Sequence, residues 1–456
     1  MATLNDIVCS WENTFNRIKR SYNLHYHLKP EQIDVITHIL RNENCFAVLP
    51  TGFGKSICYM LPPVLLNETI SDKRHYGLII SPLRSLMYDQ VRSCNAMGIK
   101  SCCITRKKDM DTETIEGIKK GLFTLLFMSP EALLFIDSWR PILLQSKIYG
   151  DGVCLIAIDE CHVLELWGDD FRPTYRMLGE LRSHFSCSFL ILTATCTNVM
   201  KRNILKQLYF GENEMQLVSK VPDRPNISLY YKFGSLSITE EMAWYLRELK
   251  SDGITARKAI IYVRTITQCG KVFANFMAYL GNAAYGDGSK VIQNRILEVY
   301  HGALASTDQE RVVSRFSQDN VLRCIICTVA FGMGVNIPDL NIVVHWGCSN
   351  SIVEYWQEVG RARRNGDPAE AHLFPLPRTV LHVEDDMKSL CEQLKHSNIP
   401  CLRVHILEHL TIKGMNPHII DEIKHRKSCD MKCECCVCLN CKCRTACKLK
   451  CPCRVN

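Results

Sequence analysis

"AVLPTGFGKSICY", residues 47–59, runs from an apolar segment through two glycines to a lysine and a serine, and then returns to apolar residues. The strict pattern of the phosphate-binding loop, G-x-x-x-x-G-K-[ST], requires glycine where this chain has Leu49. Gly52 and Gly54 still let the backbone turn, and a helix starting at Lys55 would direct its first N–H groups at an anion. The stretch therefore predicts a cradle for nucleotide phosphates or, alternatively, an ordinary glycine turn between a strand and a helix.

The surrounding segments predict a repeating pattern of strands and helices. Short apolar runs with the length of buried strands occur up to residue 195, namely CFAVLP, YGLIIS, TLLFMS, VCLIAID and SFLILTAT. Amphipathic stretches between them, such as residues 83–97 and 175–185, favour helices. This alternation is typical of a parallel sheet with helices on both faces.

A second domain of the same kind begins after VPDRPNIS, residues 221–228, where two prolines interrupt regular structure. The alternation restarts with KAIIYV, RCIICT, NIVVHW and AHLFP, and the helical patterns MKSLCEQLKH and HIIDEIKHRK follow. We therefore expect an α/β fold of two tandem parallel-sheet domains, then a short helical segment and a Cys-rich tail. The expected parts are an N-terminal segment 1–23, the two domains 24–222 and 223–375, a helical extension 376–428 and the tail 429–456.

Composition and charge give weaker indications. The 456 residues are 47% apolar, which is enough to bury large cores, and they contain neither an apolar run of about 18 residues nor a signal-like N-terminal core. The formal charge is +8, and the last 28 residues hold six Lys or Arg against two acidic residues, which favours a polyanionic partner only slightly. We expect a protein without a membrane segment that resides in the nucleus or, alternatively, the cytoplasm.

The stretch IAIDECH, residues 156–162, adds an acidic pair at the end of an apolar strand. The segment LPTGFGKS, residues 49–56, is called here the glycine loop. If a parallel strand next to this one carries the glycine loop, the loop and the acidic pair would lie at the same edge of the sheet. There Lys55 would reach the outer phosphates, and Ser56 and Asp159 would hold magnesium. Glu160 would accept a proton from an attacking water. An acidic pair also ends strands in proteins without such chemistry, but the two features together predict a nucleoside triphosphatase.

Eight ordered motifs resemble those of the superfamily 2 helicases, and in particular the RecQ family. They are LPTGFGKS, SPLRSLMYDQV, MSPEAL, AIDECHVLELWGDDFRP and LTATCT in the first domain, followed by IIYVRT, CTVAFGMGVNIPD and YWQEVGRARRNGDP in the second. The segment WGDDFRP is similar to the aromatic-rich loop of RecQ enzymes. The resemblance covers residues 24–375 and implies two RecA-like domains that use ATP and magnesium to act on DNA. Because superfamily 2 loops commonly lack the first glycine, Leu49 no longer argues against the cradle.

The resemblance implies a nucleotide site built from both domains. Gln32 in LKPEQ matches the position that recognises adenine, and Lys29 stands where the family often has arginine. In the second domain, Gln357 would face the nucleotide, and Arg361 and Arg364 match arginines that reach the γ-phosphate. The implied catalytic residues are Lys55, Asp159, Glu160, Gln357, Arg361 and Arg364, and the implied nucleotide-binding residues are Lys29, Gln32, Thr51, Gly52, Gly54, Lys55, Ser56 and Asp159.

The same resemblance implies contacts with DNA, both single-stranded and forked. Trp167, Phe171 and Arg172 would stack on the bases of a single strand, although loop aromatics also form small cores in many proteins. The residues implied to hold the DNA backbone are Ser81, Arg84 and Thr328. The chain departs from the family pattern at Leu166, Asp169, Asn336, Ile337 and Arg363, the last of which is often glycine. We therefore expect altered coupling between DNA binding and ATP hydrolysis.

The tail holds ten of the 26 cysteines. Cys-x-Cys spacing brings thiolates close enough to share a soft metal ion, and the interleaved lysines offset their charge. The tail is similar to the zinc-thiolate CXC modules of some chromatin proteins, and disulfides are the alternative. The predicted zinc ligands are Cys429, Cys433, Cys435, Cys436, Cys438, Cys441, Cys443, Cys447, Cys451 and Cys453.

Together these features predict an ATP-dependent DNA helicase or translocase of RecQ type. The resemblance implies travel from 3′ to 5′ on single-stranded DNA, the unwinding of duplexes and a part in DNA repair or recombination. The alternatives are an RNA helicase, a DNA-stimulated ATPase that does not unwind, and a non-catalytic metal-binding adaptor. RecQ enzymes commonly follow the motor with a four-cysteine zinc subdomain, whereas residues 376–428 contain only Cys391 and Cys401.

Overall fold

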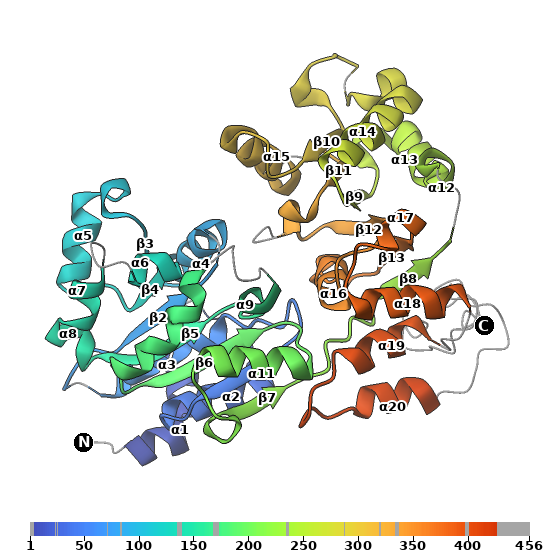
Figure 1. Cartoon of the computed structure of the whole chain (residues 1–456). Helices are drawn as coiled ribbons and strands as arrows, with labels where there is room; N and C mark the ends of the chain where they lie inside the picture. The colour runs from blue at the N-terminus through green and yellow to red at the C-terminus, as the bar shows by residue number, and fades with distance from the viewer. Residues whose placement is uncertain are drawn as a thin grey trace. The chain divides into compact units, whose positions relative to one another are not determined.

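A computed structural model describes the chain over residues 4–22, 24, 26–70, 72–82, 84–134, 139–166, 173–233, 237–286, 288–318, 321–332, 337–396 and 401–425. These residues form two compact units. Of the described residues, the first unit comprises those up to Pro222 together with Thr411–Asn416, and the second comprises those of Asp223–Leu410 together with Pro417 to His425. Each unit contains one parallel sheet (Figure 1).

The first sheet has seven strands in the order β3-β4-β2-β5-β6-β1-β7, and every pairing is parallel. The strands are β1 Cys45–Val48, β2 Tyr76–Ile80, β3 Ser101–Ile104, β4 Leu125–Met128, β5 Val153–Ile158, β6 Ser188–Thr193 and β7 Gln216–Ser219. β1, β2, β4 and β6 are buried along their whole length, because helices cover both faces of a sheet of this kind.

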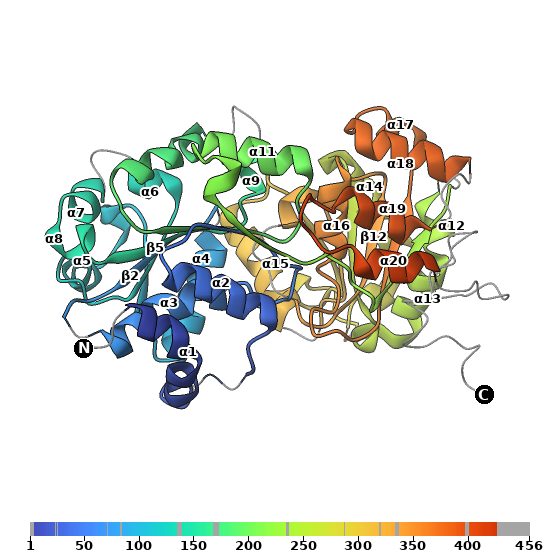
Figure 2. The ribbon, with the colours of Figure 1, turned by 90° about the horizontal axis from the view of Figure 1, so that it is seen from below.

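Figure 2 shows α2 and α3 on one face of the first sheet and α9 and α11 on the other. The helices of this unit are α1 Leu4–Ile18, α2 Pro30–Leu40, α3 Ile57–Thr69, α4 Arg84–Ala96, α5 Thr112–Lys119, α6 Pro130–Leu134, α7 Arg140–Leu144, α8 Lys147–Gly150, α9 Val163–Leu166 and α11 Asn198–Gln207. In α2 the buried residues Val35, Ile36 and Ile39 recur at helical spacing and face the sheet core. Trp11 Nε1 donates to Thr37 Oγ1 at 3.1 Å and ties α1 to α2.

The second sheet has six parallel strands in the order β10-β11-β9-β12-β13-β8. The strands are β8 Ile227–Tyr231, β9 Lys258–Val263, β10 Leu297–Tyr300, β11 Cys324–Cys327, β12 Leu340–Trp346 and β13 Ala369–Phe374. Its helices are α12 Ile238–Glu241, α13 Ala243–Asp252, α14 Ile266–Leu280, α15 Ser306–Gln318 and α16 Ile352–Val359. The helical extension supplies α17 Pro377–Val380, α18 Asp385–Lys395, α19 Leu402–His409 and α20 His418–His425.

The predicted α/β class is confirmed, since every apolar run that predicted a strand forms one. Two expectations were wrong. The strands that carry the glycine loop and the acidic pair are not neighbours, because β6 lies between β1 and β5. The stretch predicted as a helix over 175–185 lies in a 3₁₀ helix, Pro173–Ser183, rather than an α-helix. The strands β3, β7, β8 and β10 were not predicted, because polar residues interrupt their short apolar patterns.

Candidate nucleotide site and arginine turn

The glycine loop leaves β1 at the carboxyl edge of the first sheet and leads directly into α3. Gly52 and Gly54 have φ values of 77° and 85°, in the left-handed region that favours glycine. A Cβ at Gly54 would lie 2.8 Å from Nε2 of Gln32, so a side chain there would displace the glutamine. Ser56 is the N-cap of α3 and Lys55 precedes it. The loop thus has the backbone form of an anion cradle at a helix N-terminus, with Thr51 near its start.

Gln32 and Lys29 are bonded to this loop. Nε2 of Gln32 donates to the carbonyl oxygens of Phe53 and Gly54 at 2.9 and 3.1 Å. Its Oε1 accepts from the backbone N–H of Lys29 at 2.8 Å. Nζ of Lys29 donates to the Phe53 carbonyl oxygen at 3.1 Å and lies 4.0 Å from the centre of the Phe53 ring. Both ends of the Gln32 amide are occupied, so reading an adenine edge would require Gln32 to exchange these bonds.

Asp159 and Glu160 follow β5 at the same edge of the sheet. Asp159 is 5% exposed, and the hydroxyl of Tyr59 lies 3.5 Å from its Oδ2. Burial raises the pKa of Asp159 to about 7, the charge of Glu160 adds to the rise, and the charge of Lys55 opposes it. Because a divalent cation would favour the ionised carboxyl, these residues fit a magnesium site.

The end of β6 lies between the glycine loop and the acidic pair. Nδ1 of His162 lies 3.1 Å from Oγ1 of Thr193 and 3.3 Å from Oε2 of Glu160. The Thr193 hydroxyl donates to the carbonyl oxygen of Thr195 at 2.9 Å. The buried imidazole of His162 therefore joins the acidic pair to the end of β6. The sequence interpretation gave His162 no role, although its place two residues after Glu160 was a usable signal.

The residues predicted to contact DNA are only partly described. Ser81 follows β2, is 2% exposed, and its hydroxyl has no hydrogen-bond partner among the described residues. Arg84 begins α4 and is exposed. Thr328 follows β11, and its N–H donates to the carbonyl oxygen of Tyr300 at 3.2 Å. The predicted stacking residues lie outside the described residues, and they are Trp167, Phe171 and Arg172.

The ten tail cysteines, predicted as zinc ligands, also lie outside the described residues. Over the described ranges, no three metal-ligating side chains gather into a group. None of the helices in that part of the chain has the length and hydropathy needed to cross a membrane.

In the second unit, α16 ends in a turn of residues 360–367, called here the arginine turn because it carries three arginines. Gln357 lies in α16 one helical turn before Arg361, and Arg364 lies within the turn itself. Arg363 has φ of 37°, in the left-handed region that a residue with a side chain adopts only under strain. The predicted catalytic arginines therefore sit on a backbone that must be held in place.

Two buried side chains hold that backbone. Arg224 is 7% exposed and donates to three carbonyl oxygens of the arginine turn, those of Gly360, Ala362 and Arg363. Nδ2 of Asn226 donates to the carbonyl oxygens of Arg363 and Asp367 at 3.3 and 2.7 Å. Burial lowers the pKa of Arg224 to about 10, so its guanidinium stays charged at neutral pH. The sequence interpretation missed both residues because it treated VPDRPNIS only as a domain boundary.

A second buried network lies between β12 and α16. Nε2 of His345 is 2.9 Å from Oε2 of Glu358, and the same oxygen accepts from the hydroxyl of Ser349 at 2.6 Å. The ring of Tyr262 stacks on His345, with centres 5.2 Å apart. Burial raises the pKa of Tyr262 well above its usual value, and the nearby positive charge of Arg361 opposes that rise. Arg361 therefore lies close to this network.

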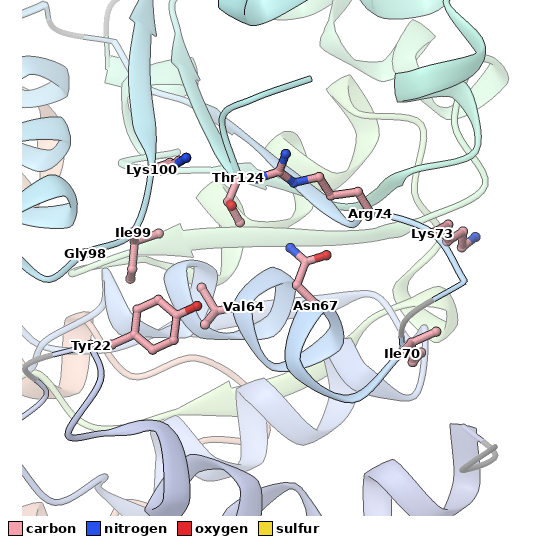
Figure 3. A pocket seen from close by; sticks show the side chains of 10 residues that line it. All are labelled: Tyr22, Val64, Asn67, Ile70, Lys73, Arg74, Gly98, Ile99, Lys100 and Thr124. Atoms are coloured by element: carbon pink, nitrogen blue, oxygen red, sulfur yellow. The ribbon is translucent and has the colours of Figure 1, made fainter. Parts of the chain in front are cut away.

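A cavity of about 460 Å³ opens at the opposite, amino-terminal edge of the first sheet (Figure 3). Lys73, Arg74 and Lys100 are among its lining residues. Lys73 donates to the carbonyl oxygen of Asp151 at 2.9 Å, and Arg74 donates to that of Gly121 at 3.0 Å. These two cations hold loops at this edge, away from the glycine loop.

Two family profiles match the chain. The DEAD/DEAH box helicase family matches residues 29–202, and the helicase conserved C-terminal domain matches residues 243–366. The first range contains the glycine loop and the acidic pair, and the second reaches into the arginine turn.

Curated relatives match most of the chain. The ATP-dependent DNA helicase RecQ of Haemophilus influenzae is 32% identical over 351 residues, which are 76% of this chain and 51% of that protein. A protein of Acanthamoeba polyphaga mimivirus named as an ATP-dependent RNA helicase is 28% identical over 364 residues, which are 79% of this chain and 60% of that protein. The chain thus spans between about half and three fifths of the length of these two relatives.

The crystal structure of the DUF1998 helicase MrfA bound to DNA and AMPPNP has a TM-score of 0.63 with this chain, at 19% identity. The match covers 90% of this chain and 55% of that one. At this level of identity the likeness supports the fold, which is that of two tandem RecA-like helicase domains.

Proposed function

Because this chain belongs to the DEAD/DEAH box helicases and matches RecQ-type DNA helicases over most of its length, we propose that it is an ATP-dependent DNA helicase or translocase of RecQ type. Its nucleotide would be ATP with magnesium, and bound magnesium would offset the phosphate charge. Travel from 3′ to 5′ on single-stranded DNA and the opening of duplexes belong to the same proposal.

The observation that carries the proposal is the convergence of three charged groups, one cation and two carboxylates, at one sheet edge. Lys55 supplies a cation at a helix N-terminus, close enough to oppose the raised pKa of Asp159. Asp159 supplies a buried carboxylate for the metal, and Glu160 supplies a second carboxylate that can accept a proton from water. These are the groups that phosphoryl transfer to water requires.

Arg361 and Arg364 would complete the site from the second domain, with Gln357 facing the nucleotide. A cation that arrives only when the domains close makes hydrolysis depend on closure. Each cycle of closure would shift the domains along one DNA strand. The residues proposed to hold the phosphates of that strand are Ser81, Arg84 and Thr328.

Steady-state ATP hydrolysis, with and without a single-stranded DNA oligonucleotide, tests the proposal. We expect DNA to stimulate hydrolysis and both Lys55→Ala and Glu160→Gln to abolish it. Displacement of a labelled strand from duplexes with a 3′ or a 5′ tail then reports direction. A wild-type chain that hydrolyses no ATP would exclude the motor and favour the non-catalytic adaptor.

An RNA helicase is the second candidate, because the mimivirus relative is named as one. Equal stimulation by RNA and DNA, unaffected by Trp167→Ala, would favour this candidate. Stimulation by DNA that is lost in Trp167→Ala would favour the RecQ-type motor.

For the tail we propose zinc bound by its cysteines, on the basis of their Cys-x-Cys spacing. Elemental analysis of the full chain and of a chain ending at residue 427 tests this: equal zinc content in both would contradict it. A nuclear location is proposed together with the DNA substrate, and imaging of a fluorescent fusion would test it.

A further inference from the structure

The guanidinium of Arg224 fixes the path of the arginine turn. Its Nη1 donates to the carbonyl oxygen of Gly360, and its Nη2 donates to those of Ala362 and Arg363, the latter at 2.9 Å. A planar guanidinium has five donors and can bind several carbonyl oxygens at once, whereas the ammonium of lysine acts as a compact point charge. The arrangement therefore depends on the shape of the arginine side chain as well as on its charge.

Arg403, in α19 of the helical extension, holds the segment that carries Arg224. Its Nη1 lies 2.7 Å from Oδ1 of Asp223 and donates to the carbonyl oxygen of Arg224 at 2.9 Å. Its Nη2 donates to the carbonyl oxygen of Ile227. Arg403 is 2% exposed, and its guanidinium lies 5.9 Å from the centre of the Trp356 ring in α16. The helical extension is thus bonded to the residues that support the arginine turn.

Arg363 shows why the turn needs this support. Its φ of 37° is unfavourable for a residue with a Cβ. Arg224 and Asn226 both donate to its carbonyl oxygen, and its own N–H donates to the carbonyl oxygen of Leu340 at 2.9 Å. A strained conformation of this kind persists only where surrounding bonds over-determine it.

We propose that Arg224 and Arg403 are positioning residues for ATP hydrolysis, through which the helical extension sets the geometry of the arginine turn. The proposal rests on the proposed function, in which Arg361 and Arg364 act on the nucleotide. Arg224 and Arg403 act only through the backbone that carries those two arginines. The helical extension is then a working part of the motor.

Substitutions of these arginines by lysine in the full chain test the proposal. Lysine keeps the positive charge but lacks the planar set of N–H donors of the guanidinium. We expect Arg224→Lys and Arg403→Lys each to lower kcat for DNA-stimulated ATP hydrolysis at least about tenfold, with KM for ATP changed less than about threefold. Arg257→Lys is the matched control, since Arg257 binds Glu248 and Glu370 in the same unit. We expect it to keep kcat within about twofold of wild type. Unchanged kcat in both test variants would overturn the proposal.

Hydrogen exchange over residues 360–367 gives a readout that does not depend on catalysis. We expect Arg224→Lys and Arg403→Lys to speed exchange at the amides of Arg363 and Gly366, and Arg257→Lys to leave it unchanged. Unchanged exchange in the two test variants, or faster exchange across the whole second unit, would overturn the proposal. A wild-type chain that hydrolyses no ATP would overturn the proposed function, whereas the exchange pattern would still decide whether the two arginines hold the turn.

A rescue experiment separates positioning from a general packing role. Glycine adopts positive φ without strain, so Arg363→Gly removes the need to hold that residue in place. We expect kcat of the double variant, Arg224→Lys with Arg363→Gly, to be about threefold or more above kcat of Arg224→Lys alone. If kcat of the double variant is lowered by the combined effects of the two single substitutions, with no recovery, the result would count against the proposal.

Discussion

Nε2 of Gln32 donates a hydrogen bond to the carbonyl oxygen of Gly54, with 3.1 Å between the two atoms. The bond joins the first turn of α2 to the glycine loop, and it forms only because Gly54 has no Cβ. The conformation of the loop before nucleotide binds is therefore set partly by a residue predicted to read the base.

Gly54→Ala should disturb both the backbone and this contact. At φ of 85° the added Cβ strains the loop, and at 2.8 Å from Nε2 it displaces Gln32. We expect a loss of about 2 kcal/mol in the free energy of unfolding, measured with urea, and a higher KM for ATP. Gly281→Ala is the control, because its φ is 56° but its Cβ would meet nothing within 4 Å. An equal effect of both variants on KM would contradict the role assigned to Gln32.

Removing the Thr193 hydroxyl should uncouple the acidic pair from the end of β6. Thr193→Val keeps the shape of the side chain but removes the hydroxyl that contacts Nδ1 of His162. Without that contact, His162 would orient Glu160 less well. We expect kcat for ATP hydrolysis to fall about tenfold with KM for ATP nearly unchanged. Thr193→Ser keeps the hydroxyl and should retain most of kcat. Similar losses in both variants would argue against the hydrogen bond as the cause.

Glu354 should make the stability of the protein depend on pH. Burial raises the pKa of Glu354 to about 7, the charges of Glu358 and Glu384 add to the rise, and the N–H of Asn350 and the charge of Arg264 oppose it. The folded state thus binds more protons than the unfolded state between the usual pKa, near 4.5, and 7. The contribution of this carboxyl to stability is full below about pH 4.5 and is lost as pH rises through 7.

Glu354→Gln stays neutral at every pH and tests this directly. We expect the free energy of unfolding of the variant, relative to wild type, to increase by about 2 kcal/mol between pH 5 and pH 8. Urea unfolding at several pH values measures the difference, and the comparison cancels other titrating groups. If the difference in the free energy of unfolding between the variant and wild type did not change from pH 5 to pH 8, Glu354 would be ionised in the folded protein over that whole range.

Arg363→Gly should stabilise the second unit. Glycine removes the strain of a positive φ. Among the described residues, the side chain that is lost forms a 3.4 Å ion pair with the exposed Asp367 and no other ion pair. We expect a gain of about 1 kcal/mol in the free energy of unfolding, measured with urea. Arg363→Ala loses the same side chain but keeps a Cβ, so it should give no gain. A similar gain in both variants would place the cause in the side chain rather than in the backbone.

The predicted strands were found where apolar runs are long, as in VCLIAID and SFLILTAT, because a buried strand needs apolar side chains on both faces. β7 was missed because Gln216 and Ser219 leave only two apolar residues in its four. The glycine loop and the acidic pair were predictable as motifs, since their spacing along the chain is itself the signal. The order of the strands was not predictable, and so the position of Thr193 beside His162 was not predictable either.

The sequence by itself determined the alternation of elements, the two sheets and the chemistry available at their carboxyl ends, because local spacing sets conformational preference and residue type sets reactivity. Only the tertiary structure decided that β6 separates the glycine loop from the acidic pair and that Arg224 supports a turn 136 residues away. It also brought Arg403 to Arg224 across 179 residues. Buried hydrogen bonds pair groups that meet in space, and nothing in their separation along the chain records that meeting.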